Sequence, residues 1–144
     1  MRQFHKLLAL SKLDKELLLR CAAIVAATRL ALCVVSYRTL RRWMPADVQA
    51  KPVSTDELCR IAWGIRTAAR VVPGATCLTQ ALAAQFLLAW SGQSSHIRIG
   101  VTKDANGQFC AHAWLISSGR VLIGGSSMDF RRYTPLVDLD IHPL

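Results

Sequence analysis

Residues 74–90 read GATCLTQALAAQFLLAW, and the organisation of the chain can be worked out from them. The pair Pro73-Gly74 is typical of a turn, and a small polar residue then precedes a long run of helix formers. We therefore expect Cys77 in the first turn of a helix. Unpaired backbone N–H groups and the positive end of the helix dipole favour a thiolate at such a position. Cys77 is accordingly a candidate nucleophile.

The second candidate residue lies in a segment that reads as a strand. Residues 109–116 read FCAHAWLI, and alternation places Cys110, His112 and Trp114 on one face of that strand. If this face meets the start of the Cys77 helix, the imidazole can take the thiol proton. The thiolate would attack a carbonyl, the imidazolium would protonate the leaving amine, and a backbone N–H would bind the oxyanion. These groups suit acyl transfer.

Such a site usually has a carboxylate or amide that orients the imidazole. A tight turn at residues 118–119 places residues 124–125 opposite His112, and both are glycines, which offer only a backbone carbonyl. Asp129 follows a few residues later and would have to reach back from its loop. We prefer it as the third catalytic residue to Asp104, which belongs to a turn.

Length and composition indicate one globular domain. The chain has 144 residues, of which 52% are apolar, and this is enough for a packed core. The 18 Lys and Arg exceed the 9 Asp and Glu, and the formal net charge of +9 favours an acidic partner. Aromatic residues are not interleaved with the basic ones, so we expect no nucleic-acid partner.

The five cysteines are an odd number and show neither a CxxC pair nor a Cys-His spacing suited to zinc. We expect no metal site, no cofactor and no disulfide framework. Cys21, Cys33 and Cys59 lie in apolar helical surroundings, where a free thiol behaves as a small hydrophobe. Free thiols, and an N-terminus without the order of a signal peptide, favour a cytoplasmic location.

Residues 12–43 are unusually apolar and follow a helical spacing, with a capping box ahead of them. Arg20 and Arg29 interrupt the apolar run, which is then too short to span a membrane. We expect a buried or interfacial helix, and both one long helix and a bent pair fit the pattern. Its apolar surface needs cover from the rest of the domain, a partner protein or a membrane surface.

The later segments separate into helices and then strands. Two prolines mark a linker over residues 45–53, and a second capping box starts a helix expected over residues 55–71. After residue 92 the period becomes alternating, and turn signals divide the segment into strands over residues 96–102, 108–116 and 120–123. Helices followed by an antiparallel meander predict an α+β fold.

A helix-start cysteine followed by a strand-borne histidine is the chain order of papain-like and transglutaminase-like enzymes. Five blocks of sequence also resemble one family within that group. The chain is similar, from about residue 5 to residue 136, to the transglutaminase-like leader peptidase of lasso-peptide biosynthesis, the B protein. The blocks are CLTQALA at 77–83, IGV at 99–101, AHAWL at 111–115, GRVL at 119–122 and RYTPL at 132–136.

The resemblance implies a cysteine protease that removes the leader from a ribosomally made precursor peptide, before an asparagine-synthetase-like lasso cyclase closes the macrolactam. Cys77 and His112 match the catalytic residues of the family. In some members an acidic third residue follows on the next strand, where Gly124 stands here. The chain resembles the stand-alone form, which requires a separate leader-binding protein. Residues 1–44 would form an N-terminal helical extension and residues 54–144 the transglutaminase-like peptidase domain, as one compact unit.

Two other functions remain open from the sequence. A transglutaminase or amine acyltransferase would keep the fold and change the acceptor. A non-catalytic protein would instead use residues 12–43 to contact a membrane surface or a partner, with Cys77 and His112 serving only in packing. For the peptidase, the basic surface would help to dock an acidic leader or the leader-binding protein.

Overall fold

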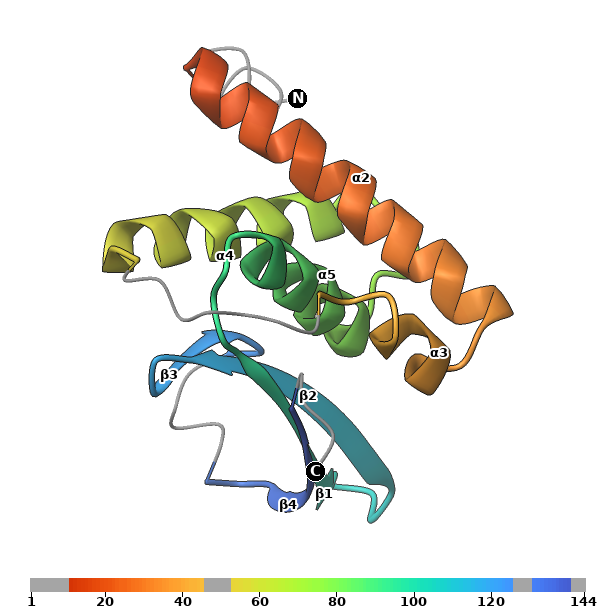
Figure 1. Cartoon of the computed structure of the whole chain (residues 1–144). Helices are drawn as coiled ribbons and strands as arrows, with labels where there is room; N and C mark the ends of the chain where they lie inside the picture. The colour runs from red at the N-terminus through yellow and green to blue at the C-terminus, as the bar shows by residue number, and fades with distance from the viewer. Residues whose placement is uncertain (1–10, 46–52, 126–130, 141–144) are drawn as a thin grey trace.

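Helices form the first half of the chain and an antiparallel sheet the second half (Figure 1), which confirms the predicted α+β fold. The computed structural model describes residues 11–45, 53–125 and 131–140. Helices α4 and α5 lie between α2 and the sheet. The elements in chain order are α2 (Lys12–Val34), α3 (Tyr37–Arg41), α4 (Thr55–Ala69), α5 (Cys77–Trp90), β1 (His96–Lys103), β2 (Phe109–Ser117), β3 (Arg120–Ile123) and β4 (Thr134–Asp140).

Each of the four helices within the described residues starts after a serine or threonine whose side chain accepts a hydrogen bond from a backbone N–H of the first turn. These N-caps are Ser11, Ser36, Ser54 and Thr76. The caps fix the helix starts that the sequence predicts near residues 12, 55 and 77. The cap at Ser36 also separates α2 from α3, so the apolar N-terminal segment is a pair of helices.

Helices α2 and α4 approach each other closely at Cys21 and Gly64. Cys21 is fully buried, and a Cβ atom at Gly64 would lie only 2.7 Å from its Sγ atom. Burial raises the pKa of the Cys21 thiol to about 11. Cys21 therefore behaves as the small hydrophobe that the sequence predicts.

The sheet has the order β3-β2-β1-β4, and its two central strands pair as predicted. The turn between them is held by Asp104, whose carboxylate accepts hydrogen bonds from the N–H groups of Asn106 and Gln108 at 2.8 and 2.9 Å. Strand β4 was not predicted. Pro135 interrupts its sequence pattern, and the ladder with β1 is irregular at this point, as is common for a proline in an edge strand.

The two layers meet through one face of the sheet. Ile97, Ala113, Leu115 and Ile123 are buried in the same apolar cluster as the inner face of α5. Because side chains alternate along a strand, the neighbours of Ala113 in β2 project from the other face. The position of His112 follows directly from this alternation.

Candidate active site

Cys77 is the first residue of α5, as the sequence predicts. The hydroxyl of Thr76 accepts a hydrogen bond from the N–H of Thr79 at 3.3 Å and caps the helix. The Cys77 side chain is half-buried and packs against the apolar core. Its backbone N–H and thiol thus lie at the positive end of the helix dipole, where developing negative charge is stabilised.

The turn before Cys77 is fitted against α2. Gly74 has φ of +73°, and a Cβ atom there would lie 2.8 Å from Nε of Arg29. The same guanidinium donates a hydrogen bond to Sγ of Cys33 at 2.9 Å. Helix α2 therefore supports the turn that positions Cys77, as well as covering the core.

His112 lies in β2, and its ring is held by a backbone acceptor. Its Nε2 atom is 2.7 Å from the carbonyl oxygen of Gly124. Because a carbonyl oxygen only accepts, this hydrogen bond uses a proton on Nε2, so in the neutral ring Nδ1 is the nitrogen that can accept a proton. His112 is thus oriented as a base through Nδ1.

Gly124 reaches this position through a backbone conformation that excludes a side chain. Its φ is +108°, and a Cβ atom would lie 2.6 Å from the carbonyl oxygen of Ala113 and 2.7 Å from Cδ1 of Trp114. A carboxylate at this position would require the backbone to move. The third position of the site is occupied here by a carbonyl, because only glycine allows the chain to pass so close to β2.

Trp114 and Tyr133 surround the imidazole of His112. The ring centroids of His112 lie 4.8 Å from Trp114 and 5.7 Å from Tyr133. Gly100, opposite His112 in β1, makes room for them, since a Cβ there would lie 3.0 Å from atoms of both aromatic residues. Tyr133 and Gly100 were not predicted as site residues, although a glycine within a strand signals close packing.

The structure brings α5 and β2 into contact, but Cys77 does not line the hollow that lies beside His112. No hydrogen bond joins Cys77 to His112 in the part of the chain that the structure describes. The face of β2 that packs on the helices carries Ala113 and Leu115, whereas His112 projects from the opposite face. A hollow of about 410 Å³ beside His112 is lined by Thr102, Lys103, Asp104, Ala105, Cys110, Gly124, Arg132 and Tyr133.

The sequence offered two carboxylates, Asp129 and Asp104, as the group that orients His112. Asp129 lies outside the described residues. Asp104 lines the hollow beside His112, but its Oδ1 atom accepts the hydrogen bonds that shape its own turn. Within the described ranges, no group of three or more His, Cys, Asp or Glu side chains is placed to hold a metal ion.

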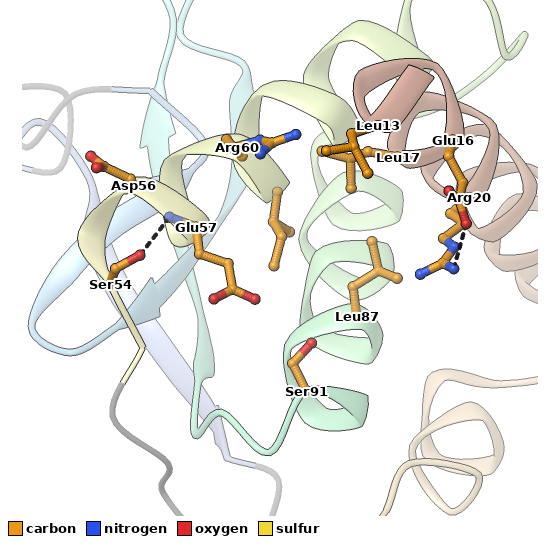
Figure 2. Close-up of a pocket in the computed structure, with 11 residues that line it drawn as sticks. Leu13, Glu16, Leu17, Arg20, Ser54, Asp56, Glu57, Arg60, Leu87 and Ser91 are labelled. Atoms are coloured by element: carbon orange, nitrogen blue, oxygen red, sulfur yellow. Dashed lines mark hydrogen bonds and ion pairs between the residues drawn. The ribbon is translucent and has the colours of Figure 1, made fainter. Parts of the chain in front are cut away.

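A second hollow, of about 620 Å³, lies between the start of α2, the start of α4 and the end of α5 (Figure 2). Its walls include Leu13, Leu17 and Leu87, which face the same space. Charged residues line its rim, and Glu16 forms an ion pair with Arg20 at 2.8 Å. Neither Cys77 nor His112 contributes to this hollow.

An α+β chain with a cysteine at a helix start and a histidine on a following strand has the layout of a cysteine-based catalytic fold. A family model described as the transglutaminase-like superfamily matches residues 21–138. The chain belongs to the transglutaminase-like superfamily, which includes cysteine peptidases and acyltransferases. Neither the curated proteins nor the solved structures contain a match to this chain. The narrower resemblance to the lasso-peptide leader peptidase stays a prediction.

Proposed function

We propose that this protein is a cysteine peptidase that removes the leader from a lasso-peptide precursor, with Cys77 as nucleophile and His112 as general base and then general acid. The observation that supports it best is the hydrogen bond from Nε2 of His112 to the carbonyl oxygen of Gly124. This bond orients the imidazole and occupies Nε2, so Nδ1 is the nitrogen that can act as the base in the neutral ring.

The reaction uses these groups in two stages. Nδ1 of His112 takes the proton of the Cys77 thiol, and the sulfur forms a bond to the carbonyl carbon of the scissile peptide. The peptide C–N bond breaks as the imidazolium returns the proton to the leaving amine. Water then attacks the thioester, gives its proton to Nδ1, and releases the leader as a carboxylic acid while the thiol is regenerated.

The proposal requires Cys77 and His112 to approach each other, and β2 is open on the relevant side. Strand β3 pairs only with residues 115–117 of β2, so it ends before it reaches His112. The backbone of Gly124, through its carbonyl oxygen, contacts His112 beyond the end of β3. His112 projects from the face of β2 opposite to α5, so the mechanism requires a rearrangement that brings His112 and Cys77 together around the open edge of β2, a larger change than the tightening of a preformed hydrogen bond.

Charge suggests how the precursor is recruited. The net charge of +9 suits an acidic leader or an acidic face of a separate leader-binding protein. A lasso cyclase would take the product, and the cytoplasm is where a ribosomal precursor is first available. Added salt should then raise KM for the precursor far more than it lowers kcat, because screening weakens encounter and leaves the chemical step unchanged. Salt-independent KM would count against electrostatic recruitment.

The direct test combines the protein with precursor peptide and leader-binding protein and follows the products by mass spectrometry. Cys77→Ala and His112→Ala should each abolish leader release, and Cys59→Ala, which changes an exposed thiol, should retain it. Hydrolysis adds the mass of water, whereas a transglutaminase product loses ammonia. Undiminished cleavage by Cys77→Ala would end the proposal.

Thiol labelling tests the pairing of the two residues without any substrate. In the wild type, iodoacetamide near neutral pH should modify Cys77 ahead of the other cysteines. His112→Ala should slow the labelling of Cys77 and leave that of Cys33 and Cys59 unchanged. Equal labelling rates in wild type and His112→Ala would show that the imidazole does not activate the thiol.

A further inference from the structure

Helix α2 carries an apolar stripe on the side that faces away from the rest of the protein. Leu19, Leu30 and Val34 are 72%, 68% and 84% exposed, and Ala23 and Ala27 are exposed between them. At about 100° per residue, these five positions fall within roughly a quarter of the helix circumference. We call Leu19, Ala23, Ala27, Leu30 and Val34 the outer stripe.

The opposite side of α2 is already used for packing. Cys21, Val25 and Thr28 are buried against α4 and α5, about half a turn around the helix from the outer stripe. In Figure 1, α2 runs along the side of the molecule farthest from the sheet. By length and composition α2 is long and apolar enough to cross a membrane, contrary to the expectation drawn from its two arginines, but one side of it packs against α4 and α5.

Beyond Glu16, which forms an ion pair with Arg20 at 2.8 Å, the charges along and just after α2 are all positive. Between Glu16 and Asp47 the sequence contains five arginines and no acidic residue. Two of them, Arg38 and Arg42, are exposed on and after α3, next to Trp43, which is 60% exposed. Exposed apolar residues, tryptophan and arginines without acids are the features that bind helices to the interface of an anionic membrane.

The same charges argue against a second copy of this chain as the occupant. A second copy docked on the outer stripe would meet the exposed Arg38 and Arg42 with no acidic residue between Glu16 and Asp47 to offset them. We infer that the outer stripe of α2 binds the surface of an anionic lipid bilayer, with the helix lying in the plane of the interface. This inference does not depend on the proposed peptidase activity.

Sedimentation with lipid vesicles tests the inference. The full chain should sediment with vesicles that mix phosphatidylglycerol and phosphatidylcholine, and much less with phosphatidylcholine alone. Sodium chloride should weaken the binding, because salt screens the attraction between arginine and the lipid headgroups. The experiment can use Cys77→Ala, so that its result is independent of any catalysis.

Two pairs of variants separate the apolar contribution from the charge contribution. Leu30→Gln/Val34→Gln should lower vesicle affinity by about tenfold or more, because both side chains lose their apolar contact. The control Leu136→Gln/Val137→Gln, which changes exposed apolar residues of β4, should leave affinity unchanged.

Charge is tested in the same way. Arg38→Gln/Arg42→Gln should weaken binding by about fivefold for each arginine. Arg120→Gln/Arg131→Gln removes two exposed arginines elsewhere and should have little effect.

Four results would overturn the inference. The first two are absence of binding to both kinds of vesicle and equal binding to both kinds. The third is retention by the membrane after alkaline carbonate, which would indicate a spanning helix. The fourth is a dimer in solution that Leu30→Gln/Val34→Gln dissociates, which would assign the stripe to a second copy. Circular dichroism of each variant ensures that loss of binding is not loss of folding.

Discussion

Cys21 and Cys77 are both cysteines of apolar helices, yet the structure gives them opposite surroundings. Cys21 of α2 is fully buried against α4, and it leaves no room for a Cβ atom on Gly64. Burial raises the pKa of the Cys21 thiol to about 11. Cys77 is half-buried at the start of α5, beside the unpaired N–H groups of a capped first turn. Helix position, and not composition, separates a packing thiol from a thiol suited to chemistry.

Removing the Cys77 thiol should abolish activity and spare stability, whereas removing the Cys21 thiol should do the reverse. The loss of cleavage in Cys77→Ala is the largest effect that we expect. Cys77→Ala should lower leader cleavage by about a thousandfold or more, with a free energy of unfolding close to that of the wild type. Cys21→Ala should keep its activity per folded molecule and lose about 1 kcal/mol of stability through the cavity it leaves. Cleavage assays and urea unfolding of both variants measure the two effects.

The surroundings of the histidine can be tested through Gly124. Gly124→Ala should destabilise the fold by about 3 kcal/mol or more and reduce cleavage, because the Cβ meets the Ala113 carbonyl and the backbone must move. Gly119→Ala is the matched control, with a similar positive φ of +71° but open space around its Cβ, and should cost only about 1 kcal/mol.

Gly124→Asp extends this test to the carboxylate that the family resemblance leads one to expect. It should fail to improve catalysis, since its Cβ has the same clash as that of alanine. A Gly124→Asp variant that is folded and more active than the wild type would show that the carbonyl is not the preferred orienting group.

The contact between Cys21 and Gly64 predicts that Gly64→Ala changes stability in opposite directions with and without the Cys21 side chain. Gly64→Ala should destabilise the wild type by about 1 to 3 kcal/mol, because the new methyl group overlaps the Sγ of Cys21. In a Cys21→Ala background the same change should stabilise by up to about 1 kcal/mol, since only the gain in helix propensity remains. Thermal unfolding of the four proteins completes the cycle.

A Cys33→Ala background serves as the control for this cycle, because Cys33 is an exposed thiol of the same helix. Gly64→Ala should remain destabilising there. Destabilisation of equal size in all three backgrounds would mean that the contact with Cys21 is not what limits position 64.

The smallest effect concerns pH. Arg98 of β1 donates two hydrogen bonds to Asp138 of β4, at 2.5 and 2.6 Å, and these bonds lower the pKa of the Asp138 carboxyl. A lowered folded-state pKa stabilises the protein above the unfolded pKa of about 3.9, and this contribution is lost as pH falls through the folded value. The pair is partly exposed, so Asp138→Asn should cost less than about 1 kcal/mol at pH 7.

As pH falls below about 4 and through the lowered folded-state pKa, the difference between wild type and Asp138→Asn should shrink towards zero, since the wild-type carboxyl becomes protonated in the folded protein as well. Urea unfolding at pH 7 and at low pH provides the comparison. A difference that grows on acidification would contradict the ion-pair explanation.

Local signals in the sequence were sufficient for most of the fold. Capping residues such as Ser54 and Thr76 fixed the helix starts, and the turn built on Asp104 fixed the register of β1 and β2. Strand β4 was missed because Pro135 hides its pattern and because it pairs with β1, which is far away in the chain. Pairing between distant segments depends on tertiary contacts that a local pattern does not contain.

The candidate site was predicted in part. The sequence placed Cys77 at a helix start, His112 on a strand and a glycine carbonyl opposite the histidine, and the structure has all three. It did not predict which face of β2 packs on the helices, since the alternating small and aromatic side chains are compatible with either choice. The catalytic roles of Cys77 and His112 remain predictions for the experiments above.

The carbonyl oxygen of Gly124, which accepts the hydrogen bond from His112, affects what mutagenesis can detect. A carbonyl belongs to the main chain, so no exchange of amino acids deletes it while the backbone stays in place. Nor does it titrate, so a pH–rate profile would contain no ionisation from an orienting acid. Under the proposed mechanism, a scan of point variants would find two catalytic side chains and would pass over the third group.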